Sequence, residues 1–397
     1  MLVDTAEEFD AVIIGAGPAG LIAATRLADL GKTVAVFEEH KEIGVPNHCT
    51  GLLSASGLKR IGVAPDKCFV QSEVKGAYFH SPTRLTFTIK AQEVNAYVVD
   101  RSAFDKTLST RAIQAGVEIR LNSRVKGLKL RDEGTYIAEA NGRNVRAKVV
   151  IDAEGYTSRL LRQVGLKPPD PKWTLPALQF EIINPNVDPT MVELFFGRDI
   201  APGFFAWIVP TGSDSARVGL ACRDGNLYQR LKQFVDKTLG KVKVDKIRPG
   251  WVILSGPIPR TFKDGFLAIG DAAGQVKPTT GGGVITGAIC AKVAGETAAK
   301  AIEQNDTTEK TLKEYETVWR ELLGKEFSTM SLVRKLADRL SDKTIDKIFK
   351  IIIEEELYQI IEQKGDIDFQ SSVIKAAIRH PGVLKALTSV ASDLLFG

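Results

Sequence analysis

The stretch Phe9-Asp-Ala-Val-Ile-Ile-Gly-Ala-Gly-Pro-Ala-Gly20 decides the fold of this chain. Its apolar, β-branched start predicts a buried parallel strand. Gly15, Gly17 and Gly20 then give the spacing G-x-G-x-x-G. The first glycine allows a tight turn, the second lets the backbone approach a pyrophosphate, and the third lets the next helix pack closely. We expect the N-terminus of that helix, with Ala19 in its first turn, to face the phosphates.

A second strand follows this helix and ends at a carboxylate. Thr33 to Phe37 form an apolar run, and Glu38 lies 18 residues after Gly20. An acid at this distance binds ribose hydroxyls in dinucleotide sites. Strand, helix and acid in register therefore favour a Rossmann-like dinucleotide-binding domain over a plain βα turn.

Length and composition are those of an ordinary globular protein. The chain has 397 residues, enough for two or three domains, with 44% hydrophobic and 25% charged residues. The net charge of +5 is mild, and no Lys/Arg block is dense enough to predict nucleic-acid binding. No apolar run reaches the roughly 18–20 residues needed to span a bilayer, and the acidic N-terminus is unlike a signal peptide. We expect a cytoplasmic protein, with peripheral binding to an anionic membrane as an open alternative.

The cysteines and histidines do not predict a metal site. The four cysteines show no C-x-x-C spacing, and only four histidines occur in the chain. The cysteines are Cys49, Cys68, Cys222 and Cys290. In a reducing compartment the default role of such residues is that of a small buried hydrophobe.

Three further stretches point back to the nucleotide domain. Arg101 stands where a predicted strand meets a helix and can donate two hydrogen bonds to a phosphate or carboxylate, with a surface arginine as the alternative. Arg124 to Leu130 predict the first strand of a hairpin around 132–134, and we expect Val125 of this strand to contact the cofactor. The sequence Asp152-Ala-Glu-Gly-Tyr-Thr-Ser-Arg159 again has the order strand, glycine turn and helix start.

A second glycine-rich signal lies at Gly265–Val284. A strand runs into Asp271, whose carboxylate can hold a ribityl hydroxyl. Gly282, Gly283 and Val284 then start a helix of small residues, and its bare N-terminus can face a flavin pyrimidine ring. The N1–C2=O edge of that ring becomes negative on reduction.

The rest of the chain predicts a second domain and a helical end. Alternating residues at 69–99 and apolar strands between 178 and 222 predict an antiparallel sheet, either a sandwiched core or one wall of a hydrophobic pocket. After residue 306 apolar stripes at helical spacing predict helices that belong to a core, close a lipid tunnel or lie on a membrane. The fold class is therefore α/β. The expected boundaries are 1–68, 100–166 and 259–305 for the FAD-binding domain, 69–99 and 167–258 for the substrate domain, and 306–397 for the helical region.

Four elements follow one another along the chain: the G-x-G-x-x-G turn with Glu38, Arg101 after a strand, Ala153-Glu-Gly155 with Ser158, and Gly270-Asp271 with Pro278. These elements, in this order, resemble the flavoproteins of para-hydroxybenzoate hydroxylase type. The resemblance implies a two-domain fold that binds one FAD. The family usually has Asp where this chain has Glu154.

Two motifs look like the geranylgeranyl reductase branch of that family. Cys49-Thr-Gly-Leu-Leu-Ser54 matches its C-x-G-x-x-S pattern. Ala201-Pro-Gly-Phe-Phe-Ala-Trp-Ile-Val-Pro210 is similar to its Pro-x-x-Tyr-x-Trp-x-Phe-Pro element, with Phe205 for tyrosine and Val209 for phenylalanine. The archaeal digeranylgeranylglycerophospholipid reductases look nearest.

This resemblance implies an oxidoreductase that uses FAD to saturate isolated C=C bonds of geranylgeranyl chains in ether lipids. Phe204, Phe205, Trp207 and Pro210 would contact the prenyl chain. The residues His48, Cys49 and Gly51 would lie by the flavin. Cys49 is a catalytic candidate because the resemblance implies that it affects turnover, and His48 is a rival candidate, since histidine exchanges protons near neutral pH. An inert thiol is the alternative for Cys49. The expected electron donor is NAD(P)H or a reduced ferredoxin.

Other functions of the same fold stay open at this point. A monooxygenase or halogenase is one, because Phe205-Ala-Trp-Ile-Val-Pro210 partly matches the halogenase element Trp-x-Trp-x-Ile-Pro, although its first tryptophan is missing. A reductase of menaquinone side chains or of geranylgeranyl diphosphate is another. A third is a non-catalytic FAD-dependent protein that binds prenyl lipid.

Overall fold

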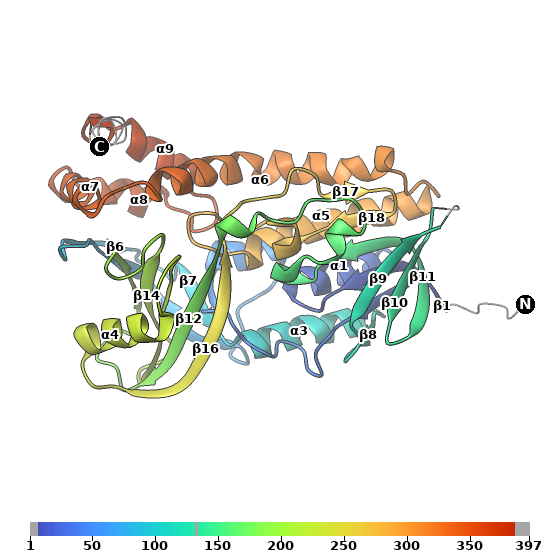
Figure 1. Ribbon diagram of the computed structural model, residues 1–397, viewed down its shortest axis with the longest axis horizontal. Coiled ribbons are helices and arrows are strands. Elements are labelled where there is room, and N and C mark those ends of the chain that lie inside the picture. The colour runs from blue at the N-terminus through green and yellow to red at the C-terminus, as the bar shows by residue number, and fades with distance from the viewer. Residues whose placement is uncertain (1–6, 132–133, 386–397) are drawn as a thin grey trace, which may run out of the picture. The chain divides into compact units, whose positions relative to one another are not determined.

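The computed structural model describes residues 7–131 and 134–385. Part of the hairpin turn expected at 132–134, and most of a helix expected at 383–395, lie outside these residues. The chain divides into two compact units (Figure 1). Unit 1 contains Met1–Asn47, Arg101–Trp173 and Ile253–Ser328, and unit 2 contains His48–Asp100, Thr174–Val252 and Thr329–Gly397.

Unit 1 is built on an eight-stranded sheet of order β17-β18-β11-β1-β2-β8, with β10 and β9 added beside β11. The pairs of β1 with β11 and β2, of β2 with β8 and of β11 with β18 are parallel, as the Rossmann-like pattern predicts. The strands are β1 (Glu7–Ile14), β2 (Val34–Phe37), β8 (Glu118–Arg120), β9 (Val125–Leu130), β10 (Tyr136–Ala140), β11 (Arg143–Asp152), β17 (Phe262–Lys263) and β18 (Phe266–Ala268).

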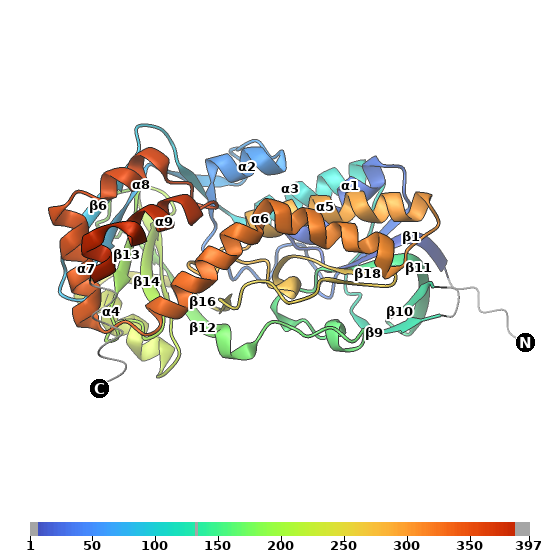
Figure 2. The same cartoon turned by 90° about the horizontal axis from the view of Figure 1, so that it is seen from above.

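Three helices pack together in unit 1. The helix α1 (Pro18–Asp29) contacts both α3 (Arg101–Gln114) and α5 (Val284–Glu303), and the three helices lie side by side in Figure 2. A Cβ at Gly295 of α5 would lie 3.0 Å from the carbonyl oxygen of Ala23, so glycine allows close contact with α1. The long helix α6 (Glu309–Ala337) follows α5.

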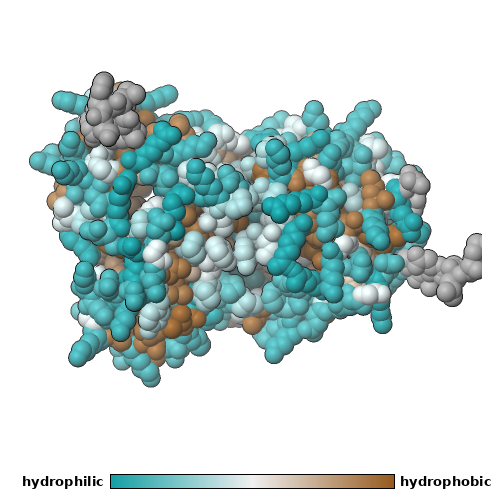
Figure 3. Space-filling model, viewed as in Figure 1, coloured by the Kyte–Doolittle hydropathy of each residue, from teal (hydrophilic) through white to brown (hydrophobic). Residues whose placement is uncertain are grey.

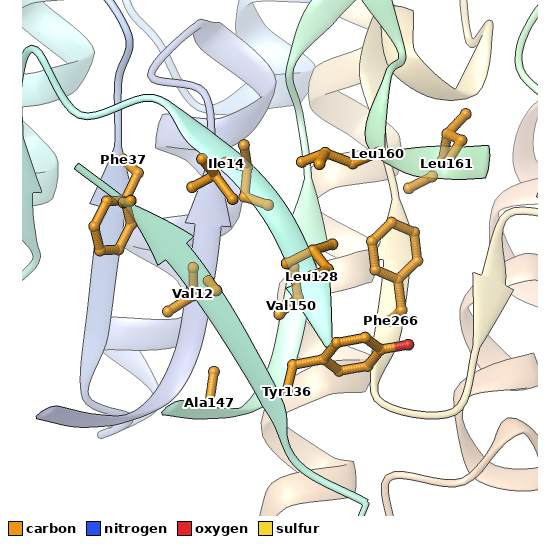
Figure 4. Packing of buried hydrophobic residues seen from close by; sticks show 14 of the residues in the cluster. Val12, Ile14, Phe37, Leu128, Tyr136, Ala147, Val150, Leu160, Leu161 and Phe266 are labelled. Atoms are coloured by element: carbon orange, nitrogen blue, oxygen red, sulfur yellow. The ribbon is translucent and has the colours of Figure 1, made fainter. Parts of the chain in front are cut away.

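The strands β9 and β10, which continue the sheet beside β11, also pack against one face of its parallel strands (Figure 4). Val12 and Ile14 alternate with residues that point the other way, and they meet Val150, Phe37 and Leu128 in one buried cluster. The antiparallel pairing of β9 with β10 confirms the predicted hairpin over its described residues.

After β11 the expected helix start is replaced by two short 3₁₀ helices, η1 (Gly155–Thr157) and η2 (Leu160–Arg162). The Glu154 carboxylate explains the difference. It accepts hydrogen bonds from the Leu160 N–H at 2.8 Å and the Thr157 hydroxyl at 3.1 Å, which closes a tight loop.

Unit 2 contains a seven-stranded sheet of order β16-β12-β15-β14-β13-β5-β6. The β12–β15–β14–β13 ladder and the β5–β6 pair are antiparallel as predicted, whereas β13 and β5 are parallel. The strands are β5 (Gly76–His80), β6 (Thr86–Lys90), β12 (Thr174–Ile183), β13 (Met191–Phe196), β14 (Phe205–Pro210), β15 (Ser215–Ala221) and β16 (Lys243–Ile253). A separate antiparallel sheet joins β3 (Leu52–Ser54), β7 (Ala96–Val99) and β4 (Val70–Val74), and the short helix α2 (Ala55–Ile61) follows β3.

Both faces of β14 and β15, in the middle of the seven-stranded sheet, are covered, which explains their apolar sequence. The helix α4 (Leu227–Leu239), which the sequence pattern did not reveal, packs on one face through Leu231 and Phe234. On the other face Phe349 of α7 (Asp342–Glu354) contacts the rings of Phe87 and Phe196, with centroids 5.1 and 5.8 Å away.

The helices α7, α8 (Tyr358–Lys364) and α9 (Ser371–Arg379) follow α6 in the chain (Figure 2). As predicted, Ser341 caps α7, since its hydroxyl accepts the Thr344 N–H at 3.2 Å. No helix among the described residues is long and apolar enough to span a membrane. On the face drawn in Figure 3, hydrophobic patches are scattered in a largely hydrophilic surface.

Candidate functional site

The three glycines after β1 have different surroundings. A Cβ at Gly15 would lie 2.4 Å from the carbonyl oxygen of Ala153, and one at Gly20 would lie 2.0 Å from that of Gly15. These two positions therefore require glycine for the turn itself. A Cβ at Gly17 would meet nothing within 4 Å. The turn alone does not demand glycine there, so its glycine leaves room for another molecule against the backbone.

The N-terminus of α1 is free of any side-chain cap. Its N-cap is Gly17, Pro18 and Ala19 occupy the first turn, and that turn contains no acidic residue. Backbone N–H groups and the positive end of the helix dipole are thus available to a phosphate.

Glu38 is held beside this turn at the end of β2. Its Oε2 accepts the Ala16 N–H at 2.8 Å, and its Oε1 accepts the backbone N–H of His40 at 2.9 Å. The carboxylate is thereby fixed next to the glycine turn, as binding a ribose hydroxyl requires.

Asp271 and the start of α5 form a second group in unit 1. A Cβ at Gly283, the N-cap of α5, would lie 2.7 Å from Asp271 Oδ1, and no side chain caps this helix. The Asp271 side chain reaches the surface, but the protein around it removes part of its contact with water. This desolvation raises the pKa of its carboxyl, and the positive charge of Arg101 lowers that pKa to a smaller extent. Gly282 and Val284 flank this N-terminus, with Gly282 against the Lys277 side chain.

Arg101 and Val125 have structural partners of their own. Arg101 opens α3 and donates to both carboxylate oxygens of Asp105 at 3.0 Å. Val125 lies in β9, where it is buried in the cluster shown in Figure 4.

The residues of unit 1 fit a dinucleotide cofactor such as FAD. Two uncapped helix N-termini, one open glycine and the carboxylates of Glu38 and Asp271 match the phosphates and hydroxyls of such a molecule. The described residues contain no cluster of three or more His, Cys, Asp or Glu that could hold a metal ion.

In unit 2 the loop before β3 forms a defined turn around Cys49. Its Sγ accepts the Gly51 N–H at 3.3 Å. Gly51 has φ +82°, and a Cβ there would lie 2.3 Å from the Val99 carbonyl oxygen, so this position requires glycine. His48 is exposed beside Gly250 of β16.

The aromatic residues predicted to contact substrate come together on β14 and just before it. Phe204 stacks on Phe205 with centroids 4.0 Å apart, and Phe205 meets Trp207 edge-on at 6.2 Å. Phe196 of β13 lies 5.7 Å from Phe205. Pro210 ends the strand opposite Ala216. The result is a continuous aromatic surface in unit 2.

Sequence reasoning missed two polar residues on the same face of this sheet, Gln179 of β12 and Arg217 of β15. Each has 3% of its surface exposed. The visible signal was the alternation in Leu178-Gln-Phe-Glu-Ile182, where polar residues recur on one face of an apolar strand.

A buried acid pair lies where the family usually has Asp in place of Glu154. Asp152 is fully buried, and its Oδ1 accepts the Glu154 N–H at 3.0 Å. Burial and the neighbouring Glu154 raise the pKa of Asp152 well above its usual range. Burial also raises the pKa of Glu154.

Comparison with known proteins agrees with this geometry. The family profile of the FAD binding domain matches residues 8–321. The chain is 33% identical over 395 residues to digeranylgeranylglycerophospholipid reductase 2 of Methanopyrus kandleri, which covers 95% of this chain and 98% of the relative. The corresponding reductase of Methanocaldococcus jannaschii is 34% identical, over 95% of this chain and 97% of the relative.

The chain belongs to the digeranylgeranylglycerophospholipid reductase family of FAD-binding flavoproteins. Among solved structures, a geranylgeranyl bacteriochlorophyll reductase-like protein of Thermoplasma acidophilum matches with a TM-score of 0.86 and 27% identity, over 97% of this chain and 99% of that one. A flavin-dependent brominase has a TM-score of 0.72 at 18% identity, over 94% of this chain and 98% of that one, and shares the fold alone. Membership confirms the resemblance to the reductase branch.

Proposed function

We propose that this chain is an FAD-dependent reductase that saturates C=C bonds of geranylgeranyl chains in digeranylgeranylglycerophospholipids. The observation that carries the proposal is similarity over nearly the whole chain to reductases of that name. Because the match includes both units, it covers the cofactor residues and the aromatic sheet.

In this proposal the residues of unit 1 hold the cofactor. FAD, when bound and reduced, supplies the hydride for the alkene. The glycine turn and α1 bind the pyrophosphate, Glu38 binds a ribose hydroxyl, and Asp271 binds the ribityl chain. The N-terminus of α5 stabilises negative charge on the flavin ring.

The aromatic surface of unit 2 receives the prenyl chain. An isolated alkene has no carbonyl to stabilise charge, so the site must exclude water and position the reacting carbon. Phe204, Phe205 and Trp207 supply apolar contact, and their ring faces can stabilise positive charge that develops on carbon. Cys49 and His48 are the candidates for a catalytic role beside the flavin, and which group supplies the proton for the second alkene carbon is left open.

The electron donor and the cellular location are two further proposals. We expect NAD(P)H or a reduced ferredoxin to reduce the cofactor, and anaerobic mixing with each donor would identify it from the rate of flavin bleaching. We also expect a cytoplasmic protein, with peripheral binding to anionic membranes as the alternative to test. Sedimentation with phosphatidylglycerol vesicles, but not with phosphatidylcholine vesicles, would support this.

An anaerobic turnover experiment tests the activity. The FAD-loaded protein is reduced with dithionite and mixed with digeranylgeranylglyceryl phosphate, and the lipid is analysed by mass spectrometry. Successive two-hydrogen increments with reoxidised flavin are expected. Unchanged lipid and still-reduced flavin would refute this substrate, and menaquinone or geranylgeranyl diphosphate would be tried next. Hydroxylated or halogenated products from an aromatic compound under oxygen would instead favour the monooxygenase or halogenase alternative.

A further inference from the structure

Three residues form a row across three neighbouring strands of unit 2. Trp207 of β14 lies opposite Gly219 of β15, and Gly219 lies opposite Gln179 of β12. A Cβ at Gly219 would lie only 2.5 Å from Cζ2 of the indole. The absence of a side chain at Gly219 therefore lets the indole lie over β15 and reach the next strand. There its Nε1 donates to Gln179 Oε1 at 3.2 Å.

The same oxygen of Gln179 binds the Cys49 turn. Thr50, the residue after Cys49, donates its hydroxyl to Gln179 Oε1 at 2.9 Å. One side-chain oxygen thus joins the two motifs that stand far apart in the sequence, the C-x-G-x-x-S turn and the aromatic strand.

Arg217 holds the backbone of the same turn. Its Nη1 donates to the carbonyl oxygens of Thr50 at 2.6 Å and of Val99 at 3.1 Å, and its Nη2 donates to Gln71 Oε1 at 2.7 Å. A Cβ at Gly51 would lie 2.7 Å from Nη1, so the glycine makes room for the guanidinium. Arg217 binds the backbone of the turn, and Gln179 binds the side chain of Thr50 within it.

The burial of Gln179 indicates more than a packing role. Its Nε2 is buried without a hydrogen-bond partner among the described residues. A buried unpaired donor lowers stability, so an apolar residue would serve packing alone better than glutamine. The acceptor oxygen is the part of this side chain that has a use in the structure.

We propose that Gln179 is a positioning residue that couples the Cys49 turn to Trp207 and thereby determines how far a prenyl chain extends past that turn. The inference rests on the proposed function, because the consequence is the number of double bonds that are reduced in each chain. Gln179 acts through Thr50 and Trp207 and needs no contact with the reacting atoms.

Two substitutions separate the acceptor oxygen from the shape of the side chain. Gln179→Met keeps the length but removes the oxygen, and Gln179→Glu keeps an oxygen in place. The matched control is Gln229→Met, on the exposed surface of α4. Reaction of Cys49 with iodoacetamide is followed by peptide mass spectrometry, with the exposed Cys68 of the same molecule as the reference.

Gln179→Met removes the hydrogen bond that holds the Thr50 side chain, together with the bond to Trp207. With the Thr50 side chain released, alkylation of Cys49 relative to Cys68 is expected to accelerate by on the order of tenfold. Gln179→Glu and Gln229→Met are expected to match the wild type. In turnover, Gln179→Met is expected to yield a larger share of partially reduced lipid, and Gln179→Glu is expected to restore the wild-type pattern.

Equal alkylation and product patterns in Gln179→Met and the wild type would overturn the proposal. If Gln179→Met fails to fold, Thr50→Val removes one of the two bonds from the half-buried turn, and the same two measurements decide. If the wild type reduces no prenyl lipid, the proposed function fails, while the alkylation rates still test the coupling.

Discussion

Replacing Gly219 with alanine is expected to be strongly destabilising, because the indole of Trp207 occupies the space that the new methyl group needs. The added Cβ would lie 2.5 and 2.6 Å from two indole carbons and 2.9 Å from the Leu178 carbonyl oxygen. The ring is buried and hydrogen-bonded to Gln179, and the oxygen belongs to the backbone of β12, so neither can move away freely. The indole must therefore leave its place over β15.

The magnitude follows from two losses. Overpacking of a filled core costs about 1–3 kcal/mol. The hydrogen bond from Trp207 to Gln179, which would break, contributes about 1 kcal/mol. The free energy of unfolding should therefore fall by about 2–4 kcal/mol in Gly219→Ala.

Urea unfolding at saturating FAD, followed by far-UV circular dichroism, measures this change, and near-UV circular dichroism reports the displaced indole. Gly127→Ala in β9 is the matched control, since a Cβ there meets nothing closer than 3.8 Å. This variant should gain about 0.4–1 kcal/mol, because alanine restricts the unfolded chain. A loss below about 1 kcal/mol in Gly219→Ala would show that the indole does not lie over β15.

Three further outcomes are expected. Asp152→Asn should raise the thermal midpoint at pH 8 but not near pH 4. The pKa of Asp152 is raised in the folded state, so its carboxyl lowers the stability of the native protein as pH rises above the ordinary aspartate range. Equal effects at both pH values would contradict this. Gly17→Ala should lower the stability of the apoprotein by no more than about 1 kcal/mol, the cost of alanine at an N-cap. It should weaken FAD binding at least about tenfold by fluorescence titration, since only a bound molecule would meet the new Cβ. Ser341→Ala should lower the free energy of unfolding by about 1 kcal/mol through loss of the α7 cap, measured in urea, with Ser341→Asn retaining it.

The elements predicted most directly from the sequence are those whose signal is local. The glycine turn, α1 and β2 occupy consecutive residues, and their spacing alone fixes their relation. The hairpin of β9 and β10 is local in the same sense. The strand β14 was also visible, although only the structure shows that both of its faces are covered.

The features that escaped depend on pairing between distant segments. Gln179 meets Thr50 across 129 residues, and no local pattern reports such a contact. The parallel pairing of β5 with β13 likewise joins segments more than a hundred residues apart. The helix α4 is an exception, because its signal is local: an apolar stripe at helical spacing follows the N-cap Asn226 and went unrecognised between the strands. Gly219 looked like any strand glycine, because its role appears only when Trp207 is placed beside it.

The route of the chain through its two units has a consequence for biogenesis. The chain passes from one unit to the other after residues 47, 100, 173, 252 and 328. The central strand β11 of unit 1 gains its partner β18 only when residue 268 has been made. During synthesis, neither unit can close until most of the polypeptide has left the ribosome, and pairings of such long range form slowly. No single cut of the chain therefore separates one unit from the other, and each unit depends on segments made both early and late in synthesis.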